Sequence, residues 1–119
     1  SYVDHTDFSV AITEAGTYKI DGLLIGDDGP NVDMDMKTNY SGTATSTFII
    51  IDSDSYQGTT SIDTDSGSDI SMGATANEEI LHGYIVATSS GTLTFSFKGD
   101  TGGGSTIETG SVITLIKVD

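Results

Sequence analysis

One stretch decides the fold class: LHGYIVATSSGTLTFSFK, residues 81–98. Its first part is apolar around Tyr84-Ile85-Val86, and its second part alternates large apolar residues with Thr and Ser from Leu93 to Phe97. Alternation with a period of two is typical of a β-strand that is buried on one face. Gly91, between the two runs, permits the tight turn of a β-hairpin. The stretch therefore predicts two long antiparallel strands.

Similar runs occur along the rest of the chain, separated by turns rich in Gly, Ser and Asp. They are residues 8–12, 18–25, 32–36, 46–51 and 111–118. The window most compatible with a helix, residues 74–81, has room for a single turn and is interpreted as a loop that leads into a strand. Seven to nine strands without intervening helices indicate an all-β antiparallel sandwich or barrel, in one domain of residues 1–119.

Two segments differ from this simple alternation. Ser46-Thr47-Phe48-Ile49-Ile50-Ile51 is apolar on both faces, so we expect a central strand that is covered on both sides. Residues 52–71 are polar and acidic with weak alternation, and this is where long loops are expected.

The chain is strongly acidic. It has 119 residues, with Lys+Arg 4 against Asp+Glu 18 and a formal net charge of −14, and none of the four basic residues is arginine. Nucleic acids and anionic membranes both attract clusters of Lys and Arg, so neither is expected as a partner. Asp33 and Asp35 alternate with Met34 and Met36, which predicts that the acids occupy turns and outward faces exposed to water.

Cysteine is absent, which excludes disulfides, zinc–thiolate sites and thiol nucleophiles. No apolar run reaches the roughly 18 residues of a membrane-spanning helix. A small domain without disulfides commonly gains stability by oligomerisation. Self-association is therefore expected.

The polar residues form no recognisable catalytic or metal motif. Counted as an EF-hand loop, the stretch from Asp52 places Gln57 where Gly is required and Asp63 where Glu is required. Neither His5 nor His82 is accompanied by a Gly-x-Ser-x-Gly nucleophile motif. We predict no enzymatic activity, no cofactor and no metal. Carboxylate pairs of a glycosidase and a divalent ion held between subunits both stay open alternatives.

The C-terminal half carries a family resemblance. Three of its segments, residues 79–88, 91–97 and 109–118, resemble the end of the TNF/C1q-like jelly rolls found in tailed-phage virion proteins. Residues 16–24 look like the first core strand of those domains. The resemblance implies an antiparallel jelly-roll sandwich that forms a homotrimer.

The final strand is apolar on both faces, with Val112, Thr114, Ile116 and Val118 on one side. In a monomeric sandwich each strand exposes one face to water, so such a strand needs a second cover. The resemblance implies that the cover is a neighbouring subunit, and the alternative is a loop. The residues expected at the subunit interface are Tyr84, Val86, Ile113 and Leu115. An ordinary core position is the alternative for Tyr84.

The resemblance implies a non-enzymatic structural protein of a phage virion. The principal expectation is a homotrimeric decoration, or cement, protein on the outer capsid surface, whose partners are other copies and the major capsid protein or another virion protein. Residues 1–7 would form an N-terminal arm, and the expected contact residues are Tyr2, Val3, His5 and Phe8. The alternatives are the receptor-binding head of a tail fibre or spike, and a carbohydrate-binding, lectin-like module.

Overall fold

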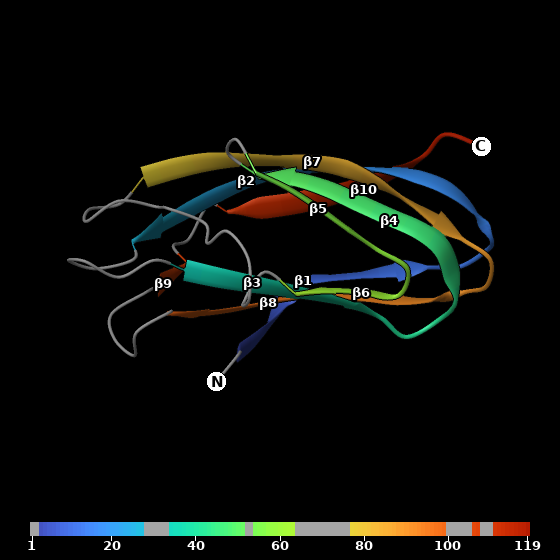
Figure 1. The fold of residues 1–119 in the computed structure, drawn as a ribbon, viewed down its shortest axis with the longest axis horizontal. Coiled ribbons are helices and arrows are strands. Elements are labelled where there is room, and N and C mark those ends of the chain that lie inside the picture. The colour runs from blue at the N-terminus through green and yellow to red at the C-terminus, as the bar shows by residue number, and fades with distance from the viewer. Residues whose placement is uncertain (1–2, 28–33, 52–53, 64–76, 100–105, 108–110) are drawn as a thin grey trace.

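A computed structural model describes residues 3–27, 34–51, 54–63, 77–99, 106–107 and 111–119. All regular elements in these ranges are strands, which confirms the predicted all-β class (Figure 1). They are β1 (Val3–Ile12), β2 (Gly16–Asp27), β3 (Met34–Tyr40), β4 (Ala44–Ile51), β5 (Asp54–Gly58), β6 (Ser61–Asp63), β7 (Asn77–Ala87), β8 (Gly91–Gly99), β9 (Thr106–Ile107) and β10 (Val112–Lys117).

The strands form two antiparallel sheets that lie in two layers (Figure 1). One sheet has the order β1-β8-β3-β6, which we call the four-stranded sheet. The other has the order β10-β2-β7-β4-β5, with β9 pairing with the end of β2, and we call it the larger sheet. The two layers are compatible with a sandwich, in which each sheet buries one face against the other.

The strand pairs are nested along the chain. β1 pairs with β8, β2 with β7, β3 with β6, and β4 with β5. The innermost pair is the local hairpin β4–β5, and each further pair joins strands that are more distant in sequence. From β1 to β4, each consecutive strand lies in the opposite sheet.

This order corrects one prediction from the sequence. The two strands expected to pair across Gly91 are β7 and β8, and they lie in different sheets. The turn between them passes from one layer to the other, and β7 pairs with β2 and β4 instead. Alternation shows which face of a strand is buried, but not which strand is its neighbour.

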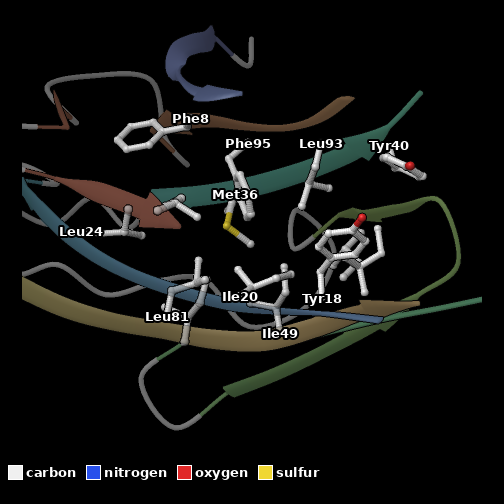
Figure 2. Packing of buried hydrophobic residues seen from close by; sticks show 14 of the residues in the cluster. Phe8, Tyr18, Ile20, Leu24, Met36, Tyr40, Ile49, Leu81, Leu93 and Phe95 are labelled. Carbon is white, nitrogen blue, oxygen red and sulfur yellow. The ribbon is translucent and has the colours of Figure 1, made fainter. Parts of the chain in front are cut away.

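The core lies between the two layers and draws apolar side chains from both. Figure 2 shows Phe95, Met36 and Leu93 of the four-stranded sheet facing Ile20 and other residues of the larger sheet. All four are fully buried. Complete burial of side chains of this size contributes about 2 kcal/mol each. Phe95 and Leu93, from the alternating part of residues 81–98, therefore lie in the core together with Met36 and Ile20.

At one end of the sandwich, two turns are joined by hydrogen bonds. The Tyr40 hydroxyl, at the end of β3, donates to the backbone carbonyl of Ser89. The Ser89 hydroxyl in turn accepts from the backbone N–H of Thr43 at 2.9 Å. Burial raises the pKa of the Tyr40 hydroxyl, and the neighbouring Tyr18 adds to the shift. These contacts fix the turn that carries the chain from β7 in one sheet to β8 in the other.

Two expectations about exposure differ from the structure. Asp35 lies on the outward side of β3, as the alternation predicts, but it is fully buried. In β4, Phe48 and Ile50 are partly exposed, so the expected cover on both faces is not provided by the described part of this chain. The neighbouring acid Asp33 lies outside the described residues.

Candidate interaction surface

The outer face of the four-stranded sheet is hydrophilic. Strand registers place small hydroxyl and amide side chains side by side on it. Its outward residues include Ser9, Ala11, Lys37, Asn39, Ser61, Thr92 and Thr94. The Ser9 and Thr94 hydroxyls form a hydrogen bond at 3.3 Å across the β1–β8 pair. The exposed part of this face is suited to contact with water, whereas Asp35 and Ser96, which share the face, are buried.

The outer face of the larger sheet has the opposite character. Residues paired across neighbouring strands share a face, so the registers of β10, β2, β7 and β4 define which side chains point outward. The apolar ones among them are Leu23, Ile25, Phe48, Ile50, Ile80, Tyr84, Val86, Val112 and Ile116, and Val118 follows β10. We call this set the outer apolar face.

Large side chains on this face are open to solvent. The exposed fractions are 67% for Ile80, 54% for Ile116, 49% for Val112 and 38% for Tyr84. Single exposed apolar residues are ordinary on protein surfaces, whereas this face carries several of them, interrupted in the same registers by Lys19, Asp21, His82 and Thr114. Several exposed apolar side chains on one sheet face make it a candidate interaction surface.

The middle of the outer apolar face holds an aromatic pair. Phe48 of β4 and Tyr84 of β7 are opposite one another in register, and their rings stack with centroids 5.8 Å apart at an interplanar angle of 23°. On the other side of Tyr84 lies Lys19 of β2, which forms an ion pair with Asp21 at 3.3 Å. Both charged side chains are well exposed, so this ion pair adds less than about 1 kcal/mol to stability.

A glycine allows β4 and β7 to approach closely beneath the aromatic pair. Gly83 precedes Tyr84 and is opposite Ile49 in the β4–β7 register. A Cβ at Gly83 would lie 1.9 Å from the backbone oxygen of Phe48, a distance that no side chain tolerates. The absence of a side chain at this position therefore sets the strand spacing at which Phe48 and Tyr84 stack.

The edge strand β10 is attached to β2 at both of its ends. Before β10, the Ser111 hydroxyl accepts from the backbone N–H of Ile25 at 2.8 Å and donates to the Ile25 carbonyl at 3.2 Å. After β10, the backbone N–H of Val118 donates to the carbonyl of Thr17 at 2.8 Å. These bonds hold Val112 and Ile116 in the outer apolar face.

The four residues predicted for a subunit interface fall on two different faces. Tyr84 and Val86 point outward, Tyr84 being exposed and Val86 half-buried. Ile113 is a buried core residue, and Leu115 packs against the core from the inside. The residues of β10 that point outward are therefore Val112 and Ile116, and not the predicted Ile113 and Leu115. Since β10 is apolar on both sides, its alternation does not tell which side faces inward.

The N-terminal contact residues are only partly described. Tyr2 lies outside the described residues, and Val3 and His5 belong to β1, although the structure does not describe their side chains. The predicted arm of residues 1–7 overlaps the start of β1, which pairs with β8 from Val3 onward. Phe8 is a core residue, 4% exposed, and its ring meets that of Phe97 edge to face at 5.8 Å. It is not available for contact with a partner.

The carboxylate and histidine positions add little to the site. Among the described residues there is no group of three or more His, Asp or Glu side chains that could hold a metal ion. Of the acidic stretch of residues 52–71, residues 52–53 and 64–71 lie outside them. His82 is exposed on the outer face of β7, opposite Asp21 in register. A search of the same ranges finds no helix able to cross a membrane.

Sequence reasoning missed several residues of this face. Ile80 and Phe48 were part of apolar runs, but nothing in the sequence showed that their face lacks a cover. The usable signal was the alternation of Ile80, His82, Tyr84 and Val86 against the buried Leu81 and Ile85. Comparison with known proteins adds no assignment: no family model matches the chain, and no curated protein or solved structure matches it either.

Proposed function

We propose that this chain is a non-enzymatic structural protein of a phage virion. In this proposal it is a jelly roll that assembles as a homotrimer and decorates the outer surface of the capsid. It acts by binding: each trimer bridges neighbouring capsid subunits and adds binding free energy to the assembled shell.

The nested strand pairs support the jelly-roll part of the proposal. A jelly roll has eight strands in two sheets, built from two Greek keys. A chain folded into four nested pairs and then rolled over places strands 1, 8, 3 and 6 in one sheet and strands 2, 7, 4 and 5 in the other. β1 to β8 have this order, and β9 and β10 add to β2.

The observation that carries the function is the contrast between the two outer faces. One is lined mainly by Ser, Thr and Asn, whereas the other carries exposed apolar side chains on β10, β2, β7 and β4 beside Lys19, Asp21 and His82. A protein that works alone has no use for a broad uncovered apolar face, while a subunit of an assembly buries it. The polar face and the charge of −14 suit exposure to water outside a shell.

The phage assignment itself rests on the sequence resemblance. The segments that resemble virion jelly rolls coincide with β7, β8, β10 and the first part of β2. Those strands supply both the centre of the core and most of the outer apolar face. The resemblance therefore covers the residues on which fold and assembly depend.

The proposal is tested on purified virus particles produced from the genome that encodes this chain. Quantitative mass spectrometry of separated heads and tails should find the chain in heads, in a fixed ratio to the major capsid protein. Heads stripped of the chain should lose resistance to heat, and adding back the purified protein should restore it. Absence of the chain from heads, or its presence in tails alone, would overturn the proposal.

A further inference from the structure

We infer that the free edge of β10 binds an extended, positively charged segment of another protein, which joins the larger sheet as an additional strand. This binding surface goes beyond the proposed function and does not depend on a place in a virion. Three features of the molecule support it: the hydrogen bonds of β10, the form of this strand compared with the other edge strands, and the charge of the chain.

The pairing of β2 with β10 determines which backbone groups of β10 lie at its free edge. The backbone N–H of Val118 donates to the carbonyl of Thr17 at 2.8 Å. Because backbone groups alternate between the two edges of a strand, every second residue of β2 from Thr17 onward turns its N–H and C=O towards β10. Their register partners are Val112, Thr114 and Ile116. The N–H and C=O groups at the opposite edge of β10 belong to the residues between and after these, which we call the free-edge residues: Ile113, Leu115 and Lys117.

The backbone groups of the free-edge residues have no partner within the part of the chain that the structure describes. There, β10 pairs with β2 alone, and the backbone hydrogen bonds outside the strand ladders involve none of the three residues. An antiparallel strand on this edge can exchange two hydrogen bonds with each of them, about six in all. An extended peptide is the ligand whose own N–H and C=O groups match such a row, as in other cases of strand addition to a sheet edge.

β10 differs from the other edge strands, which are β1, β5 and β6. The pairing of β1 has a register shift between Asp4 and Ser9, β5 begins with Asp54, and β6 has only three residues. Short strands, irregular pairing and charges are devices that keep an edge from accepting another strand. β10 has an unbroken register and no charge before Lys117. The Lys117 ammonium is turned to the Glu14 carboxylate of its own chain, at 3.6 Å, so it does not block the edge.

The side chains beside the free edge indicate the composition of the added strand. Val112 and Ile116 point to the outer face and are 49% and 54% exposed, with Thr114 between them. An added strand places every second side chain on the same face, next to these residues. Apolar, β-branched side chains at those positions would cover the exposed apolar area of β10. The favoured segment therefore has apolar residues at alternate positions.

The charge of the chain favours a basic segment of another protein over a second copy of β10. With a net charge of −14, two copies that join edge to edge bring together two strongly acidic molecules. A segment that carries Lys or Arg is instead attracted to the chain, and this attraction speeds its binding. The occupant is therefore an extended segment in which apolar and basic residues alternate.

The test measures hydrogen exchange of the backbone amides by NMR on the full chain, with and without a peptide. In the free chain, the amides of the free-edge residues should exchange faster than those of Val112, Thr114 and Ile116, which bond to β2. The probe is a peptide of about seven alternating valine and lysine residues, blocked at both ends and long enough to span β10. At saturation it should slow exchange at the free-edge amides at least ~10-fold.

Two N-methylated forms of the same peptide are the matched controls. One is methylated on its valine amides and the other on its lysine amides, so their composition and charge agree while each lacks the hydrogen-bond donors of one edge. Because an extended strand presents only one edge to β10, one form should protect the free-edge amides and the other should not. A peptide with glutamate in place of lysine should bind at least ~10-fold more weakly, because the chain repels it.

Several results would overturn the inference. The free-edge amides may not be protected in the free chain, and the valine–lysine peptide must slow their exchange when present at about 1 mM, above the dissociation constants of specific interfaces. Equal protection by the two N-methylated forms would exclude strand addition. Protection that arises without peptide as the concentration of the chain increases would make a second copy the occupant. Each of these results leaves the virion role standing, because that role is tested by the presence of the chain in virus heads.

Discussion

Replacing Gly83 by alanine should disturb both the fold and the outer apolar face. The added Cβ would lie 1.9 Å from the backbone oxygen of Phe48, 2.8 Å from its carbonyl carbon and 2.9 Å from the Cα of Ile49. All three atoms belong to the backbone of β4, which cannot move aside as the end of a flexible side chain can. Side-chain Cβ atoms essentially never approach within 3.0 Å, so β4 and β7 must separate by at least 3.0 − 1.9 = 1.1 Å.

That separation has a calculable cost. A ladder hydrogen bond of about 2.9 Å, lengthened by that amount, is no longer a hydrogen bond. Two such bonds beside Gly83 contribute about 1 kcal/mol each, and the strain of overpacking adds about 1–3 kcal/mol. We therefore expect Gly83→Ala to lower the free energy of unfolding by about 3–5 kcal/mol. The same separation should displace Phe48 from its stacking contact with Tyr84.

Gly22→Ala is the matched control for this experiment. Gly22 also lies within the larger sheet on an inward-facing position, but a Cβ there meets the Ile113 side chain at 3.1 Å and the Val112 oxygen at 3.3 Å. These contacts require only a few tenths of an ångström of adjustment, and alanine is intrinsically better than glycine in a strand by about 0.5–1 kcal/mol. Urea denaturation of both variants gives the comparison. If Gly83→Ala is destabilised no more than Gly22→Ala, the close approach of β4 does not limit the position.

Three further substitutions test other parts of the structure. Tyr40→Phe should cost about 1 kcal/mol near neutral pH through loss of the bond to the Ser89 carbonyl. The pKa of Tyr40 is raised in the folded state, so above about pH 10 this hydroxyl ionises first in the unfolded chain, and the folded protein loses stability as the pH rises. Chemical denaturation from pH 8 to 11 should therefore show a smaller decline in stability for Tyr40→Phe than for the unmodified chain. An equal decline would contradict the assignment. Ser111→Ala should lower the free energy of unfolding by about 1–2 kcal/mol and speed hydrogen exchange of the Ile25 backbone amide, because both bonds of the Ser111 hydroxyl to Ile25 are lost. An unchanged exchange rate would mean that the hydroxyl does not hold β10 against β2. Phe95→Ala should lower the free energy of unfolding by about 3–5 kcal/mol, whereas Thr92→Ala, at an exposed position, should lower it by less than about 0.5 kcal/mol. Thermal or urea unfolding measures both, and similar values would contradict the placement of Phe95 in the core.

The sequence predicts the strands well because alternation is a local property. The runs around Phe95 and Ile20 both become strands, and their inward residues form the core. Pairing depends on the whole chain and is less readable. The turn near Gly91 has the composition of a hairpin, but it connects two sheets, since β2 and β4 already occupy both edges of β7. Competition between distant strands for an edge leaves no trace in a short window of sequence.

The orientation of β10 illustrates why the candidate surface was only half predictable. Val112, Ile113, Ile116 and Leu115 are similar in hydropathy, so the two faces of this strand look alike in sequence. The structure distinguishes them by register: Ile113 is opposite Gly22, where the missing side chain leaves room for it in the core. In β7 the same ambiguity does not arise, because His82 marks the outward face on which Tyr84 and Val86 also lie.

The two-sided strands also bear on how so acidic a chain combines solubility with the proposed association. The core between the sheets uses only the inward half of each apolar run, from Ile20 and Leu81 to Ile49. The outward half of these runs, which includes Leu23 and Tyr84, adds nothing to that core. Its exposure to water is unfavourable in free energy unless another surface covers it. The acid in the middle of this face, Asp21, is paired with Lys19, while the net charge of −14 opposes contacts made in other orientations of the proposed assembly. In the proposed assembly the apolar side chains of this face favour one contact, and the net charge suppresses the rest.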